Sequence, residues 1–148
     1  CVTEERLVPV ASPRLHAAVA PGDAWTSLPR LSLSGGREMW SQWFAFAGLL
    51  PAIGPTHRFD SFIAAMAAAS AGAGVLLGSR PLVDGALATG ELVRLSDREL
   101  PSASGHFLTY ADDARLSPTA LEFLSWIESA AFHDHDASFS GGQASQAP

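Results

Sequence analysis

The chain has 148 residues, 47% of them hydrophobic, which is enough for the core of one compact domain. Its formal net charge is -6 with only 9 Lys and Arg residues, so it lacks the clustered basic surface that attracts a nucleic-acid backbone. The single Cys, at position 1, cannot form an intramolecular disulfide, and no stretch approaches the roughly 18 continuous apolar residues of a membrane span.

The first half of the chain alternates short extended segments with helical ones. The predicted strands are residues 6–12, 31–34 and 57–59. Ser12 and Pro13 predict the N-cap and first residue of a short helix, and Asp23 predicts the cap of a short turn. A longer helix is predicted over 37–48, ending at Gly48, with one face formed by Trp40, Trp43, Phe44 and Ala47.

An alanine-rich helix is predicted to follow Asp60 and Ser61. Its small side chains let it lie close against a sheet, and we expect its bulk to come from Phe62, Ile63 and Met66. Gly72 and Gly74 then let the chain turn directly into a buried strand over 74–78.

The last part of the chain continues the alternation. A short helix is predicted within 81–90, a strand over 91–95, a loop to about 104 and a strand over 105–111. Ser117 and Pro118 predict the start of an amphipathic helix that ends near 131. The segment from about 133 lacks an apolar period and is predicted to be disordered.

The alternation of strands and helices predicts an α/β domain with a largely parallel sheet covered by helices on both sides. Ligands of such sheets bind beyond the carboxyl ends of the strands. This rule selects three polar loops, residues 34–40, 58–62 and 77–81.

The order of several motifs resembles one known family. These motifs are "ERLVPVASPRL", "MWSQWFAFAGL", "HRFDSFIAAMAAASAGAGVLLGSRPLVDGALATGELVRL" and "SPTALEFLSWI". Together they resemble the C-terminal part of a LysR-type transcriptional regulator, in the branch of the glycine-cleavage activators and the β-lactamase-inducing regulators. The resemblance covers roughly residues 5–131.

The resemblance implies the fold of type 2 periplasmic binding proteins, in which two α/β subdomains are joined by crossing strands. Residues 1–12 would be the crossing strand into subdomain II, and 13–95 would form that effector-binding subdomain. Residues 96–131 would be the return strand and helix of subdomain I, and 132–148 a disordered tail. The chain would thus hold one complete subdomain and the C-terminal strand and helix of the other.

The same resemblance implies that the domain binds a small-molecule effector in the cleft between the subdomains and passes a conformational shift to a helix-turn-helix. That DNA-binding part is absent from these residues, and the first residue is Cys with no leader sequence after it, so the chain is expected to be an internal fragment. The expected setting is cytoplasmic, with self-association as dimers or tetramers and no membrane, catalytic activity, metal or cofactor.

The candidate effector-binding residues come from two of the three polar loops and their flanks. They are Ser34, Gly35, Gly36, Trp40, Phe59, Asp60 and Ser61. A helix start with free backbone N–H groups favours an anionic or polar group, and an ionised Asp60 would oppose an anion, so Ser61 is the better donor. The competing interpretation is that Asp60 and Ser61 only cap a helix and that Trp40 belongs to the core.

Two other functions compete with a sensor domain. A solute-binding protein of the same fold would serve transport, and an isolated fragment could act as an oligomerisation module. Enzymatic sites find little support: Ser102 and His106 lack a nucleophile-elbow motif, and "GAGVLLG" follows a helix where a dinucleotide fingerprint would open one. His133 and His135 lie in the predicted tail and are not expected to hold a metal.

Overall fold

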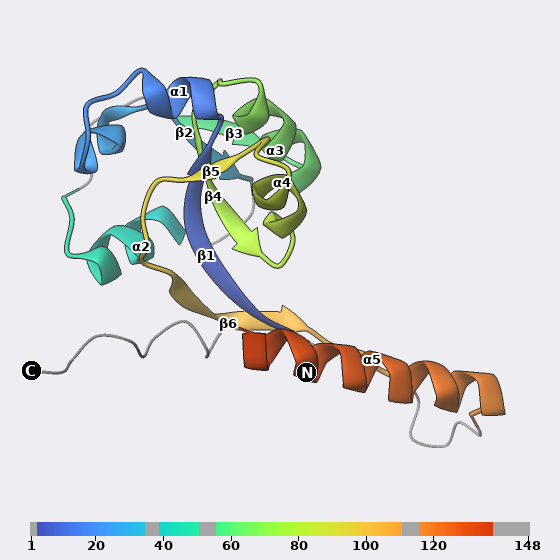
Figure 1. Ribbon diagram of the computed structural model, residues 1–148. Coiled ribbons are helices and arrows are strands. Elements are labelled where there is room, and N and C mark those ends of the chain that lie inside the picture. Colours follow the sequence, from blue (N-terminus) through green and yellow to red (C-terminus); the bar gives the residue numbers. More distant parts are fainter. Residues whose placement is uncertain (1–2, 35–38, 51–55, 111–115, 138–148) are drawn as a thin grey trace, which may run out of the picture. The chain divides into compact units, whose positions relative to one another are not determined.

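The structure is a computed structural model that describes residues 3–34, 39–50, 56–110 and 116–137. Its residues cluster into two compact units, one of residues 5–103 and one that joins residues 1–4 to 104–148. Figure 1 shows the order of the elements along the chain.

Six strands and five α-helices make up the described chain. The strands are β1 (Thr3–Ala11), β2 (Arg30–Leu33), β3 (Thr56–Phe59), β4 (Val75–Arg80), β5 (Val93–Arg94) and β6 (Leu100–His106). The helices are α1 (Pro13–Ala17), α2 (Met39–Ala47), α3 (Phe62–Ser70), α4 (Asp84–Ala88) and α5 (Pro118–Ala137), with a short 3-10 helix, η1 (Asp23–Ser27).

The sheet is mixed in direction. Its strand order is β3-β2-β4-β1-β5, and β6 also pairs with β1. The neighbours β3, β2 and β4 are parallel, whereas β1 is antiparallel to both β4 and β5. The prediction of a largely parallel sheet is therefore wrong for β1, because this strand lies between β4 and β5 instead of beside β2, its successor in sequence.

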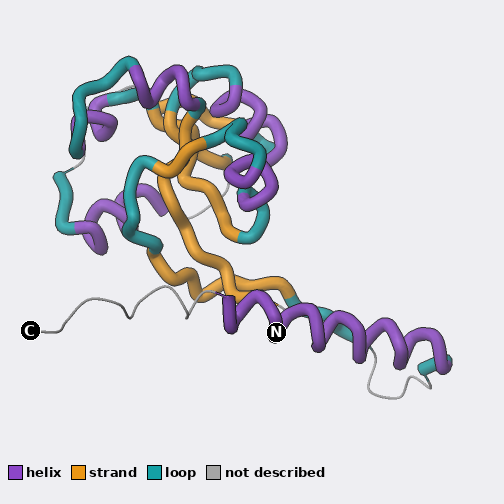
Figure 2. The backbone as a smooth tube through the Cα atoms, in the orientation of Figure 1, coloured by secondary structure: helices purple, strands orange, loops and turns teal. Residues whose placement is uncertain are grey.

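Alternate side chains of β4 point to opposite faces of the sheet and into two separate apolar clusters. Val75 and Leu77 belong to the cluster under η1 and α2, and Leu76 belongs to the cluster under α3 and α4. Figure 2 shows the strands of this unit with α2 on one side and α3 and α4 on the other. Residues 5–103 thus form a three-layer α/β unit.

The helix faces explain this layering. Trp43, Phe44 and Ala47 of α2 are buried, which confirms the predicted apolar face. In α3 the two fully buried side chains are Ala65 and Ala69, so alanine does bring the helix close to the sheet. Phe62 and Met66 pack at the edge of the same cluster.

Ile63, expected to pack with them, is exposed to solvent. Its position is one residue beyond the stripe of 62, 66 and 69, and one residue turns a helix by about 100°.

Two glycines after α3 make the entry into β4 possible. Gly72 has φ +84, a conformation that side chains disfavour, and it follows the C-cap of the helix. A Cβ on Gly74 would lie 2.4 Å from the carbonyl oxygen of Pro29. The predicted direct turn from helix to strand therefore depends on both residues.

Several boundaries in the last third differ from the sequence prediction. The predicted strand 91–95 is reduced to Val93–Arg94. The last strand is β6, Leu100–His106, and not 105–111; residues 107–110 have no regular secondary structure and residue 111 lies outside the described residues. Helix α5 continues to Ala137, past the predicted end near 131, whereas 138–148 lie outside the description.

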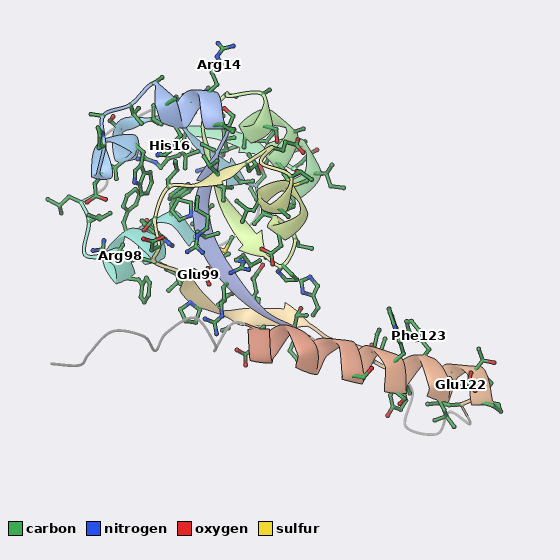
Figure 3. The ribbon with its side chains drawn as sticks, viewed as in Figure 1. Arg14, His16, Arg98, Glu99, Glu122 and Phe123 are labelled. Atoms are coloured by element: carbon green, nitrogen blue, oxygen red, sulfur yellow. The ribbon has the colours of Figure 1, made fainter. Side chains whose placement is uncertain are left out.

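The unit that contains α5 has large apolar side chains on its surface. Phe107, Leu108, Tyr110, Leu121, Phe123 and Trp126 are all exposed. Phe123 and Trp126 stack with ring centroids 5.9 Å apart. Figure 3 labels Phe123 beside Glu122 on this helix.

Candidate functional site

The carboxyl ends of β2 and β3 lie side by side and hold four of the seven candidate residues. Leu33 of β2 is in register with Phe59 of β3. Just beyond, the backbone N–H of Ser34 donates to the carbonyl of Phe59 at 2.6 Å. Asp60 and Ser61 follow directly and are exposed. Gly35 and Gly36 lie outside the described residues.

Ser61 is the N-cap residue of α3, but its side chain makes no capping hydrogen bond. Its backbone is extended, with φ -129 and ψ 133, and its carbonyl accepts from Ala65 N at 3.1 Å. The N–H groups of the first helical turn precede that bond and find no partner within the helix. The exposed start of α3 therefore combines a free hydroxyl with backbone donors.

Trp40 is half-buried against the cluster under α2. Its indole N–H donates to the carbonyl of Leu31 at 3.1 Å. The ring stacks on Phe44 at 5.6 Å between centroids and meets Trp43 edge-on at 6.5 Å. Its polar and apolar groups are thus both engaged within the core.

Phe59 packs on the opposite face of the sheet, at the edge of the cluster under α3. The structure thus brings Phe59 together with Ser34, Asp60 and Ser61, and places Trp40 across the sheet from Phe59.

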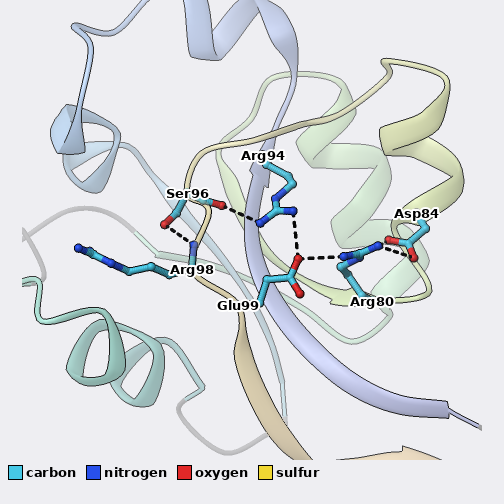
Figure 4. Close-up of polar contacts among 6 residues, drawn as sticks. All are labelled: Arg80, Asp84, Arg94, Ser96, Arg98 and Glu99. Atoms are coloured by element: carbon cyan, nitrogen blue, oxygen red, sulfur yellow. Dashed lines mark hydrogen bonds and ion pairs between the residues drawn. The ribbon is translucent and has the colours of Figure 1, made fainter. Parts of the chain in front are cut away.

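Residues 77–81, predicted as a polar loop, are mostly the end of β4, and they contribute the most extensive polar network of the described chain. Arg80 binds Asp84 through two bonds, Nε to Oδ1 at 2.6 Å and Nη2 to Oδ2 at 3.2 Å. Its Nη1 also donates to Glu99 Oε1 at 2.9 Å, and Arg94 Nη1 reaches the same oxygen at 3.0 Å. Figure 4 shows these contacts, with Arg94 also donating to the carbonyl of Ser96.

The electrostatic effect of this network falls on Arg80. The hydrogen bond that Arg80 donates to Asp84 is the largest influence raising the pKa of Arg80 above its ordinary value, and Glu99 adds to it against the cost of burial. The guanidinium therefore stays charged. The sequence shows only part of this arrangement: Arg80 and Asp84 are four residues apart, across the turn from β4 to α4, whereas Glu99 is distant in sequence.

Next to Arg80, the hydroxyl of the buried Ser79 donates to the carboxylate of Glu5. No spacing or motif in the sequence pairs these two residues, which are 74 positions apart. The antiparallel register of β1 with β4 sets Leu7 opposite Ser79, and Glu5 lies two residues along on the same face of β1.

The histidines do not gather into a site in the described part of the chain. His16 is exposed on the short helix α1, near Arg14, which points outward in Figure 3. His106 Nδ1 lies 2.9 Å from Thr3 Oγ1. Among the described residues no group of three potential ligands could hold a metal, and the side chains of His133 and His135 lie outside the description.

Among the described residues, no helix combines the length and the apolar character that crossing a membrane requires.

Comparison with known proteins identifies relatives of both sequence and fold. The chain is 26% identical over 125 residues to the HTH-type transcriptional regulator PerR of Escherichia coli (strain K12). The matched region covers 83% of this chain but only 42% of that protein.

The effector domain of the transcriptional regulator AmpR of Pseudomonas aeruginosa has the same fold. It matches with a TM-score of 0.77 at 23% identity, over 94% of this chain and 68% of that domain. The AmpR effector-binding domain from Citrobacter freundii matches with a TM-score of 0.63 at 20% identity, over 86% and 64%.

The fold, a mixed sheet with helices on both faces, agrees with the arrangement that the sequence motifs imply. The family model of the LysR substrate binding domain matches residues 1–131. The chain therefore belongs to the LysR substrate binding domain family.

Proposed function

We propose that this domain senses a small-molecule effector for a LysR-type DNA-binding transcriptional regulator. The protein that carries it would contact DNA through a helix-turn-helix outside residues 1–148, work in the cytoplasm and assemble as a dimer or tetramer. The effector would bind one arrangement of the domain more tightly than another and so shift the population of states. The relative found by sequence is a transcriptional regulator, which favours this function over solute transport or catalysis.

One observation carries the choice of site: the start of α3 lies beside the carboxyl end of β2, with the Ser61 hydroxyl uncommitted. Helix starts favour acceptor groups because their N–H groups and partial positive charge point outward. We infer that Ser61 and the neighbouring backbone N–H groups bind a carboxylate or carbonyl of the effector. Ser34 and Phe59 would border the same place.

The carboxylate of Asp60 limits which effectors fit. It is exposed directly before Ser61. A purely anionic ligand would meet repulsion there, whereas a ligand with both an acceptor and a cationic group, such as an amino acid, would satisfy both residues. Trp40 lies at the start of α2, but we assign it no contact with the effector, because its N–H bonds to Leu31 and its ring stacks on Phe44.

The experiment is a ligand screen followed by matched serine variants. The chain is tested by thermal shift against the twenty amino acids and a set of short mono- and dicarboxylic acids, and the strongest ligand is titrated by calorimetry. Ser61→Ala should weaken binding by about tenfold, the loss of one charge-assisted hydrogen bond.

Ser27→Ala is the control, because Ser27 is an exposed serine of η1 whose hydroxyl donates to Ala24. Equal affinities in the two variants would contradict the assignment of Ser61. In the complete regulator, Ser61→Ala should weaken the response to that ligand while operator binding is retained. An unchanged response would exclude the site.

A further inference from the structure

Two strands connect the two compact units of the chain. The division falls between residues 4 and 5 in β1 and between residues 103 and 104 in β6. We call the residues of the larger unit next to these crossings the two roots, namely 5–7 of β1 and 98–103, which comprise the two residues before β6 and its first four residues. Each root carries a glutamate, Glu5 in the first and Glu99 in the second.

Both glutamates bind the carboxyl end of β4, on consecutive residues. Glu5 accepts from the hydroxyl of Ser79, which is 5% exposed. Glu99 accepts from Arg80 at 2.9 Å. Consecutive residues of a strand face opposite sides of the sheet, so the two roots are held from its two faces.

The contact between Arg80 and Glu99 is supported by further ion pairs on both residues. The side chain of Glu99 is only 15% exposed and its Oε1 receives both Arg80 and Arg94. Two bonds to Asp84 fix the guanidinium of Arg80 to the first turn of α4. Salt weakens a partly buried ion pair less than an exposed one, so the attraction between Arg80 and Glu99 is stronger than that of an exposed pair.

We propose that Ser79 and Arg80 form a mechanical anchor that makes the roots of both connecting strands move together with the end of β4 and the start of α4. Such an anchor gives the carboxyl edge of the sheet a direct physical route to the only two strands that join the units in the described chain. A displacement of β4 or α4 would reach β1 through Glu5 and β6 through Glu99. The inference concerns conformational transmission and stands whether or not Ser61 binds the effector.

The test is hydrogen exchange of backbone amides in the 148-residue chain. Glu99→Gln keeps the size of the side chain and removes its charge, so amides in 98–103 should exchange about tenfold faster, as expected from the loss of charge-assisted bonds at partial exposure. Glu91→Gln is the matched control, because Glu91 is an exposed glutamate of the same unit. Amides of α3 should not change in either variant.

Two further variants test whether the anchor is shared. Arg80→Gln should speed exchange both in 98–103 and at the start of α4, and Ser79→Ala should speed exchange in 5–7. If Arg80→Gln affects α4 alone, or if Glu99→Gln lowers protection evenly across the unit, the network only adds stability and the proposal is wrong. Arg80→Lys serves if Arg80→Gln fails to fold, because Lys keeps the charge but lacks the fork of donors that binds Asp84 and Glu99 together. It should speed exchange in 98–103 and at the start of α4, and unchanged exchange in 98–103 would overturn the anchor.

Discussion

Substituting Gly74 by Ala tests the close approach between the start of β4 and Pro29, the residue before β2. Gly74 is buried, and a Cβ there would lie 2.4 Å from the carbonyl oxygen of Pro29 and 3.0 Å from Leu31 Cδ2. The same carbonyl accepts from Val75 N at 2.8 Å, at the start of the pairing between β2 and β4. The clash is with backbone, which cannot rotate away, so the added methyl must displace Pro29 and weaken that hydrogen bond.

The magnitude follows from two costs and one smaller gain. Overpacking costs about 1–3 kcal/mol and a weakened hydrogen bond about 1 kcal/mol, while Ala reduces the entropy of the unfolded chain by an amount equivalent to roughly 0.4–1 kcal/mol. We expect Gly74→Ala to lower the free energy of unfolding by about 2–3 kcal/mol, or the Tm by roughly 10–20 °C for a unit of about 100 residues.

Gly85→Ala supplies the control within the same unit. Gly85 lies inside α4, and a Cβ there would have nothing within 4 Å. This variant should raise the free energy of unfolding by about 0.5–1 kcal/mol, because Ala is the better helix former. Urea unfolding followed by circular dichroism measures both. The packing argument fails if Gly74→Ala lies within about 0.5 kcal/mol of the original chain, or if Gly85→Ala is equally destabilising.

The remaining predictions concern the aromatic cluster and the first helix. Phe44→Ala should cost about 3–5 kcal/mol, because the ring is buried among Trp25, Trp40 and Trp43, whereas Phe46→Ala on the exposed side of α2 should cost under about 1 kcal/mol. Similar losses in urea unfolding would contradict the assignment of the buried face. Ser12→Ala should cost about 1 kcal/mol by removing the hydrogen bond that the Ser12 hydroxyl accepts from Leu15 N at 3.3 Å. An unchanged unfolding midpoint would show that this cap contributes nothing.

Sequence periodicity predicted the helices well where the apolar stripe is wide. The stripe of Trp40, Trp43, Phe44 and Ala47 located α2, and its buried members confirm the predicted face. The Ser61 start and the two glycines after α3 located that helix to within a residue. These signals are local, so no tertiary information was needed.

The strands near the end of the chain were less predictable, because their pairing decides their limits. Residues 100–106 are rich in Ser and contain Pro and Gly, which is typical of a loop, yet they form β6 against β1. The more apolar residues 107–110 are not in a strand. Partner strands can impose extended structure on a sequence whose propensity opposes it.

The candidate site was predictable only as a set of loops. The rule of carboxyl strand ends selected Ser34, Asp60 and Ser61, and the structure does bring them to one edge. Trp40 is close in sequence to one of these loops, but its N–H is engaged by the carbonyl of Leu31 in the core. Glu5 and Glu99 were not selected, because each is distant in sequence from the residue of β4 that it binds.

The positions of the four tryptophans make the two units spectroscopically distinct. Trp25 and Trp43 are buried in the unit of residues 5–103, and Trp40 is half-buried there. Trp126 is 62% exposed on α5. Its emission should be red-shifted and readily quenched by acrylamide, whereas that of the other three is shielded. The chain thus contains an intrinsic fluorophore that reports contacts of α5 separately from the folding of the larger unit.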